Sequence, residues 1–100
     1  MFIAMNRFRV LEGKEQSFEE VWRERDSHLS QVPGFKTFSL LKGDSEDGAT
    51  LYSSHVIWES RQAFEDWTKS EAFRTVHAGA GNTRGMMAGA PKLELFEAVL

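Results

Sequence analysis

The 100-residue sequence predicts an α+β protein of the ferredoxin-like class, in which a four-stranded antiparallel sheet carries two helical segments. Three observations lead to this prediction. Four segments alternate apolar and polar residues as strands do, two regions have apolar residues at helical spacing, and their order along the chain is β-α-β-β-α-β. We therefore expect one domain that spans residues 1–100.

The first predicted strand covers residues 2–11 and has an unusual member on one face. That face carries Phe2, Ala4, Phe8 and Val10, with Asn6 among them. A buried amide without a hydrogen-bond partner costs a few kcal/mol, about 1–3 by mutational measures. The simplest expectation is a bond to neighbouring backbone, and a role in a site is the alternative.

The middle of the chain predicts one helix and two strands. A helix over residues about 15–31 follows from apolar spacing, and Ser17-Phe-Glu-Glu20 resembles a capping box near its start. After the turn at Pro33-Gly34, a strand over 35–42 and a polar turn over 43–48 should lead to an antiparallel strand over 49–58.

The last third predicts two short helices, about 60–69 and 70–79, that meet at Ser70, a plausible N-cap. Trp67 and His77 lie on their inward faces. A glycine-rich loop over about 78–90 is then expected to be flexible or functional, with Met86 and Met87 either covering an apolar ligand or lying on the surface. The fourth strand is expected over 92–100.

Composition narrows the classes of function. The net charge of −3 does not suggest nucleic acid, and without cysteine there can be no disulfide or thiolate metal site. No apolar run is long enough to cross a membrane, so we expect a cytoplasmic protein. His28 is expected to be a solvated or boundary residue. His55 is expected to form structural hydrogen bonds, with a role in a site as the alternative.

Large apolar residues occur on both faces of the first, second and fourth predicted strands, whereas helices cover only one face of this fold. A second copy of the sheet is the simplest cover. We therefore predict a homodimer whose two sheets close into a dimeric α+β barrel.

Three segments of the chain resemble a known family. They are Met5-Asn6-Arg7, Pro33-Gly34-Phe35 and the string Trp58-x5-Phe64-x2-Trp67-x-Lys-Ser-x2-Phe73-x3-His77. Together they are similar to the IsdG-type haem-degrading monooxygenases of the antibiotic-biosynthesis-monooxygenase superfamily, which are dimeric α+β barrels. The resemblance covers nearly the whole chain.

This resemblance implies a haem oxygenase in which haem is both cofactor and substrate. It is consumed with O2 and electrons from an external donor, either a reductase or a small reductant, and iron and a linear tetrapyrrole are released. The family's catalytic residues fall on Asn6, Trp67 and His77. His77 would be the ligand of the haem iron, Asn6 would donate a hydrogen bond to oxygen at the haem, and Trp67 would press on the porphyrin.

Two other functions remain open. One is cofactor-independent oxygenation of a quinol or polyketide, which occurs in the same superfamily and would make His77 a general base or a polar wall. The other is a non-catalytic dimeric barrel that binds haem or another ligand, because a fold alone does not fix a function.

Overall fold

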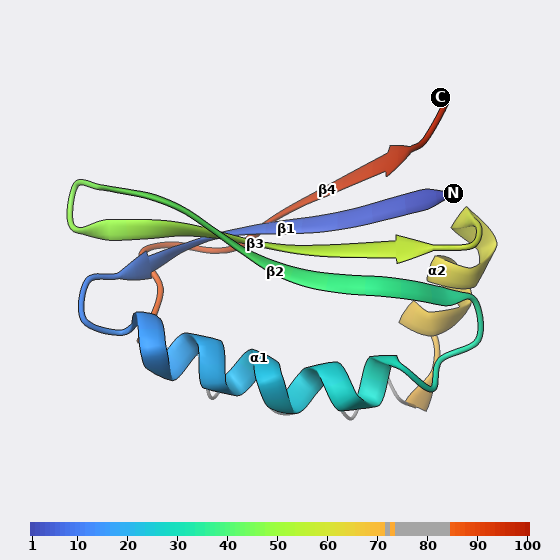
Figure 1. Cartoon of the computed structure of the whole chain (residues 1–100), viewed down its shortest axis with the longest axis horizontal. Coiled ribbons are helices and arrows are strands. Elements are labelled where there is room, and N and C mark those ends of the chain that lie inside the picture. The colour runs from blue at the N-terminus through green and yellow to red at the C-terminus, as the bar shows by residue number, and fades with distance from the viewer. Residues whose placement is uncertain (72, 74–84) are drawn as a thin grey trace.

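The computed structural model describes residues 1–71, 73 and 85–100, with the backbone alone at residues 25–28. The element order is β1 (Phe2–Leu11), α1 (Glu15–Leu29), β2 (Phe35–Glu46), β3 (Ala49–Trp58), α2 (Arg61–Thr68) and β4 (Lys92–Glu97). The predicted ferredoxin-like fold is confirmed. Figure 1 shows α1 running along one side of the sheet, with α2 beside the end where β1 begins and β3 finishes.

The four strands form one antiparallel sheet in the order β2-β3-β1-β4. β4 ends at Glu97, three residues before the predicted end, because its last partner on β1 is Phe2. β2 was predicted too short. It runs to Glu46 and reaches β3 through Asp47 and Gly48, whose φ angles of 53° and 77° suit a two-residue hairpin turn.

The predicted capping box on α1 is wrong. The helix begins at Glu15, its N-cap residue is Lys14, and no side chain caps it, so Ser17 lies within the first turn. The Glu15 carboxylate instead accepts a hydrogen bond of 2.7 Å from the backbone N–H of Gly13. A hydrogen bond from the backbone N–H of Glu15 itself, followed by this bond from Gly13, draws the pKa of the Glu15 carboxyl below its usual value.

Two clusters of buried side chains form the core between the sheet and the helices. The first contains Phe2, Ala4, Leu29, Val56 and Trp58, and residues of α2 pack against it. The second contains Phe8, Val10, Phe18 and Tyr52. Both clusters lie on the same side of the sheet, which leaves the opposite face without a helix among the described residues.

The described end of the glycine-rich segment packs against the core. Met86 accepts a backbone hydrogen bond of 2.7 Å from Leu11, and Ala88 donates one of 2.7 Å to Arg9. Met86 and Met87 pack against the second core cluster. The expectation of a loose surface position is therefore wrong, and neither methionine lines the cavity described below. Residues 78–84 of the predicted flexible loop lie outside the described part of the chain.

Gly34 places α2 against the turn that precedes β2. Its φ is +82°, and a Cβ built on it would collide with the Cβ of Ala63 on α2. Its carbonyl also accepts a 2.7 Å hydrogen bond from the N–H of Glu59, just before α2. This close approach holds the helix that carries Trp67 onto the sheet.

We expect Gly34→Ala to lower the free energy of unfolding by about 1–3 kcal/mol more than Gly13→Ala does, because overpacking adds to backbone strain. Gly13 is a matched control, since its φ is +90° but a Cβ there would meet nothing within 4 Å. Urea unfolding of both variants measures the difference. Equal losses would show that α2 moves away from Gly34 at little cost.

Tyr52 anchors α1 to the sheet, because its hydroxyl donates a 2.5 Å hydrogen bond to Glu19. Burial, followed by this hydrogen bond and the Glu19 charge, raises the pKa of Tyr52 well above its usual value. The stabilisation linked to the neutral hydroxyl is fully present below the unfolded pKa of about 10 and is lost as the pH rises through the raised pKa.

We expect the folded protein to show no tyrosinate absorbance at a pH where the unfolded chain is half ionised. Tyr52 is the only tyrosine of the chain, so one ultraviolet titration reports it. Glu19→Gln should bring the pKa down, whereas Glu20→Gln, at an exposed neighbouring position, should leave it in place. A parental titration curve for Glu19→Gln would show that burial alone causes the shift.

Candidate functional site

A cavity of about 290 Å³ lies between the sheet and the helices. Its volume is at the lower end of the range usual for small-molecule sites. The described wall is formed by side chains of every element except β2, namely Ala4, Asn6, Trp22, Leu29, Ser54, Val56, Trp58, Phe64, Trp67, Thr68, Phe73 and Leu93. The wall is mainly aromatic and aliphatic, with the few polar groups that are typical of a ligand pocket.

Asn6 is one of those polar groups and lies half-buried on β1, directly opposite Ser54 of β3. In the part of the chain that the structure describes, no residue forms a hydrogen bond with its side-chain amide. The simplest expectation, a bond to neighbouring backbone, is not met there. The amide is therefore available to a ligand in the cavity, as both donor and acceptor.

Trp67 enters the same cavity from α2, within a group of aromatic rings. Its ring centroid lies 5.4 Å from that of Trp58, 6.4 Å from Phe64 and 4.8 Å from Phe73, the last in edge-to-face geometry. Trp58 is fully buried at the end of β3. These contacts hold the Trp67 indole in one orientation at the cavity wall.

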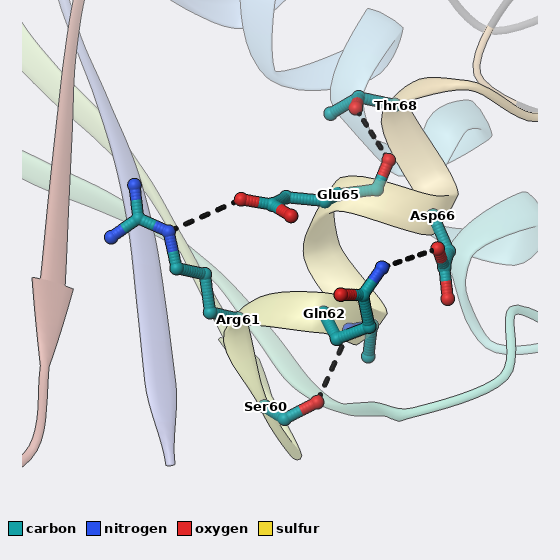
Figure 2. Close-up of polar contacts among 7 residues, drawn as sticks. Ser60, Arg61, Gln62, Glu65, Asp66 and Thr68 are labelled. Atoms are coloured by element: carbon teal, nitrogen blue, oxygen red, sulfur yellow. Dashed lines mark hydrogen bonds and ion pairs between the residues drawn. The ribbon is translucent and has the colours of Figure 1, made fainter.

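Local hydrogen bonds define both ends of α2 and so the position of Trp67. Figure 2 shows Ser60 accepting a bond of 3.1 Å from the N–H of Ala63, and the side-chain pairs Arg61–Glu65 and Gln62–Asp66 one turn apart. After the helix, Ser70 donates to the Trp67 carbonyl at 2.6 Å and accepts from the N–H of Phe73 at 3.1 Å.

The hydrogen bond from Phe73 to Ser70 is the one predicted for a cap that starts a second helix. The rest of that helix, predicted over about 70–79, lies largely outside the described residues, as does His77. Asn6 and Trp67 are thus brought to one cavity, and the third predicted site residue stays a prediction.

The remaining histidines are placed differently. His55 pairs with Met5, next to the pair of Asn6 with Ser54, so the alternation of strand side chains puts it on the face opposite the cavity. The structure does not describe the side chain of His28. Within residues 1–71, 73 and 85–100, no three His, Asp or Glu side chains gather as ligands for a metal ion.

Sequence reasoning missed several residues of the wall. The predictions from sequence did not identify four residues that line the cavity, namely Trp22, Leu29, Ser54 and Thr68. Helical spacing could have identified Trp22 and Leu29 as inward, but it does not distinguish a core position from a cavity wall. Ser54 carried a signal, because it is a small polar residue among large apolar ones on the inner face of β3.

A comparison with known protein families identifies the family to which this chain belongs. Residues 1–79 match the family described as antibiotic biosynthesis monooxygenase. The chain belongs to that family. Its fold also agrees with a solved member: a putative antibiotic biosynthesis monooxygenase from Nitrosomonas europaea superposes with a TM-score of 0.76, at 17% identity and with both chains covered completely.

Relatives of this chain include proteins named as a haem oxygenase and a haem degrader. A staphylobilin-producing haem oxygenase of Staphylococcus saprophyticus is 24% identical over 84 residues, which cover 84% of this chain and 80% of the relative. The haem degrader MhuD of Mycobacterium tuberculosis, solved with two haems in its active site, is 29% identical with a TM-score of 0.75, covering 100% of this chain and 97% of MhuD.

A solved structure of a protein with different chemistry has the same fold. SnoaB of Streptomyces nogalater, a cofactor-independent oxygenase, is 23% identical with a TM-score of 0.72, covering 99% of this chain and 93% of SnoaB. Among the described residues, no helix is long and apolar enough to cross a membrane.

Proposed function

We propose that this member of the monooxygenase family binds haem in the cavity between sheet and helices and degrades it. Haem would be both cofactor and substrate, O2 the oxidant, and a reductase or a small reductant the electron donor. The products would be iron and a linear tetrapyrrole. The observation that carries the proposal is that Asn6 and Trp67, from β1 and α2, line one cavity.

The cavity wall suits a flat apolar ligand with few polar contacts. Aromatic rings from β3, α1 and α2 supply stacking surface, and the Asn6 amide supplies a hydrogen-bonding group with no partner among the described residues. Haem, when bound, supplies the iron at which oxygen is activated.

Each residue then has a separate task. The neutral imidazole of His77 would hold the iron. The Asn6 amide would donate a hydrogen bond to an oxygen atom in the cavity and so orient it, which is the type of electrostatic contribution that usually dominates catalysis. Trp67, held by Trp58 and Phe73, would press on one face of the porphyrin and bias which ring carbon reacts.

Titration of the purified protein with hemin tests this function. We expect a Soret band that saturates, and then its decay in air with ascorbate, together with iron that an added chelator captures. An anaerobic sample should keep the band. Saturable binding without decay would instead indicate a binding protein, and no binding would favour cofactor-independent oxygenation.

We further propose that the protein acts as a homodimer joined through the helix-free face of its sheet. Ile3 lies between Ile57 and Phe96 on this face, because it pairs with both. Leu41, Leu51 and Phe96 are 45%, 36% and 48% exposed. Large apolar side chains therefore occur on this face in all four strands, and a second copy of the sheet offers a complementary cover for them.

Sedimentation at micromolar concentration should therefore detect a dimer, with or without hemin. Phe96→Lys should shift it towards the monomer, because it places a charge in the apolar contact. Val99→Lys is the control, since Val99 lies beyond the end of β4 and is 86% exposed. A monomeric parent protein would exclude this assembly.

A further inference from the structure

A second hollow of about 280 Å³ lies on the same side of the sheet as the cavity, towards β2. Its described wall consists of Glu19, Trp22, Arg23, Phe38, Leu40, Lys42 and Tyr52. It is rimmed by charged groups and floored by apolar ones. Its volume nearly equals that of the cavity.

Trp22 is the described residue that lines both hollows. The strand register shows how close they are. Ser54 lines the cavity and its direct partner across the β3–β2 pair, Leu40, lines the second hollow. Neighbouring strands are about 4.8 Å apart, so a wall residue of one hollow lies directly beside a wall residue of the other.

The Trp22 indole is held in this position by its neighbours. It stacks on Phe38 with ring centroids 5.6 Å apart and an interplanar angle of 12°. Phe8 and Phe18 contact it from other directions, with centroids at 5.5 and 6.2 Å. A ring packed on three sides by aromatic groups is a fixed wall rather than a mobile one.

We propose that Trp22 is a specificity-determining residue that closes the cavity towards β2 and so sets the largest ligand the cavity admits. A smaller side chain at this position would join two hollows of similar volume into one space about twice as large. Ligands that extend past the present wall would then bind. The inference does not rest on haem as the ligand.

Two related dyes provide probes of different length. Anilinonaphthalene sulfonate binds exposed apolar sites, and its bis form consists of two such units joined together. All three tryptophans of the chain line the cavity, so their three indole N–H signals in NMR spectra report whether a dye lies in the cavity or on the helix-free face of the sheet.

In Trp22→Leu we expect the affinity for the bis dye, relative to the single dye, to rise at least about tenfold over the parental ratio. The indole signals of Trp58 and Trp67 should shift on binding. Phe18→Leu is the matched control, because Phe18 is a fully buried ring in contact with Trp22 that lines neither hollow, and it should leave the ratio unchanged.

Trp22→Met removes a similar volume and gives the same test should the leucine variant not fold, because the flexible methionine side chain can repack against the neighbouring rings. A double variant, Trp22→Leu with Leu40→Trp, refills the second hollow and should return the ratio to the parental value. Equal ratios in Trp22→Leu and Phe18→Leu would overturn the proposal. Parental protein that binds the bis dye in the cavity as tightly as the single dye would overturn it too.

Discussion

Asn6→Ala is expected to slow haem degradation by about a hundredfold to a thousandfold, as removal of one preorganised hydrogen-bond donor does in other enzymes. Its effect on stability should be below about 1 kcal/mol, because no described residue loses a hydrogen bond with this amide. Hemin should still bind, since the aromatic wall of the cavity is unchanged. Soret titration, ascorbate-driven decay and urea unfolding measure the three quantities.

The matched control is Ser53→Ala. Ser53 is a buried polar residue of β3 that pairs with Arg7, next to the Asn6–Ser54 pair, and so lies on the opposite face of the sheet. The Ser53→Ala variant should degrade haem at the parental rate. Parental turnover in Asn6→Ala would make Asn6 a polar residue of the wall without a catalytic task.

His77→Ala is expected to lower turnover by more than about a hundredfold, since changes to groups that merely support a metal ligand already cost about 10–100-fold. The Soret band should move, and the fold should persist by circular dichroism. His55 lies on the face of the sheet opposite the cavity, so it is not placed to hold a ligand there.

His55→Ala is accordingly the matched control, and it should keep both the Soret position and the rate of the parent. An unchanged band and rate in His77→Ala would transfer the ligand role to His28 or His55. If His55→Ala alone abolished turnover while sedimentation still detected a dimer, the haem would lie on the helix-free face, and the proposed cavity would be the wrong site.

Local patterns in the sequence were sufficient to predict the order and most limits of the helices and strands. Alternating polarity located β1 and β3 at their observed limits, and apolar spacing located α1 and α2 to within about two residues. The alternation along β1 also singled out Asn6 on an apolar face. These are properties of neighbouring residues, and side-chain direction in a strand or helix follows directly from them.

Interactions between distant segments decided the rest. β4 stops where β1 has no further residue to pair with, and β2 continues through a polar stretch because its backbone pairs with β3. α1 begins at Glu15 without a side-chain cap, and the Glu15 carboxylate accepts a hydrogen bond from the N–H of Gly13.

The sequence by itself determined the family, the fold and two candidate residues on inward faces. Only the tertiary structure decided that Asn6 and Trp67 share one cavity, that Trp22 separates this cavity from a second hollow, and that His55 lies on the other side of the sheet. Periodicity fixes the direction of a side chain, whereas the side chain that faces it across a cavity depends on strand register and helix docking.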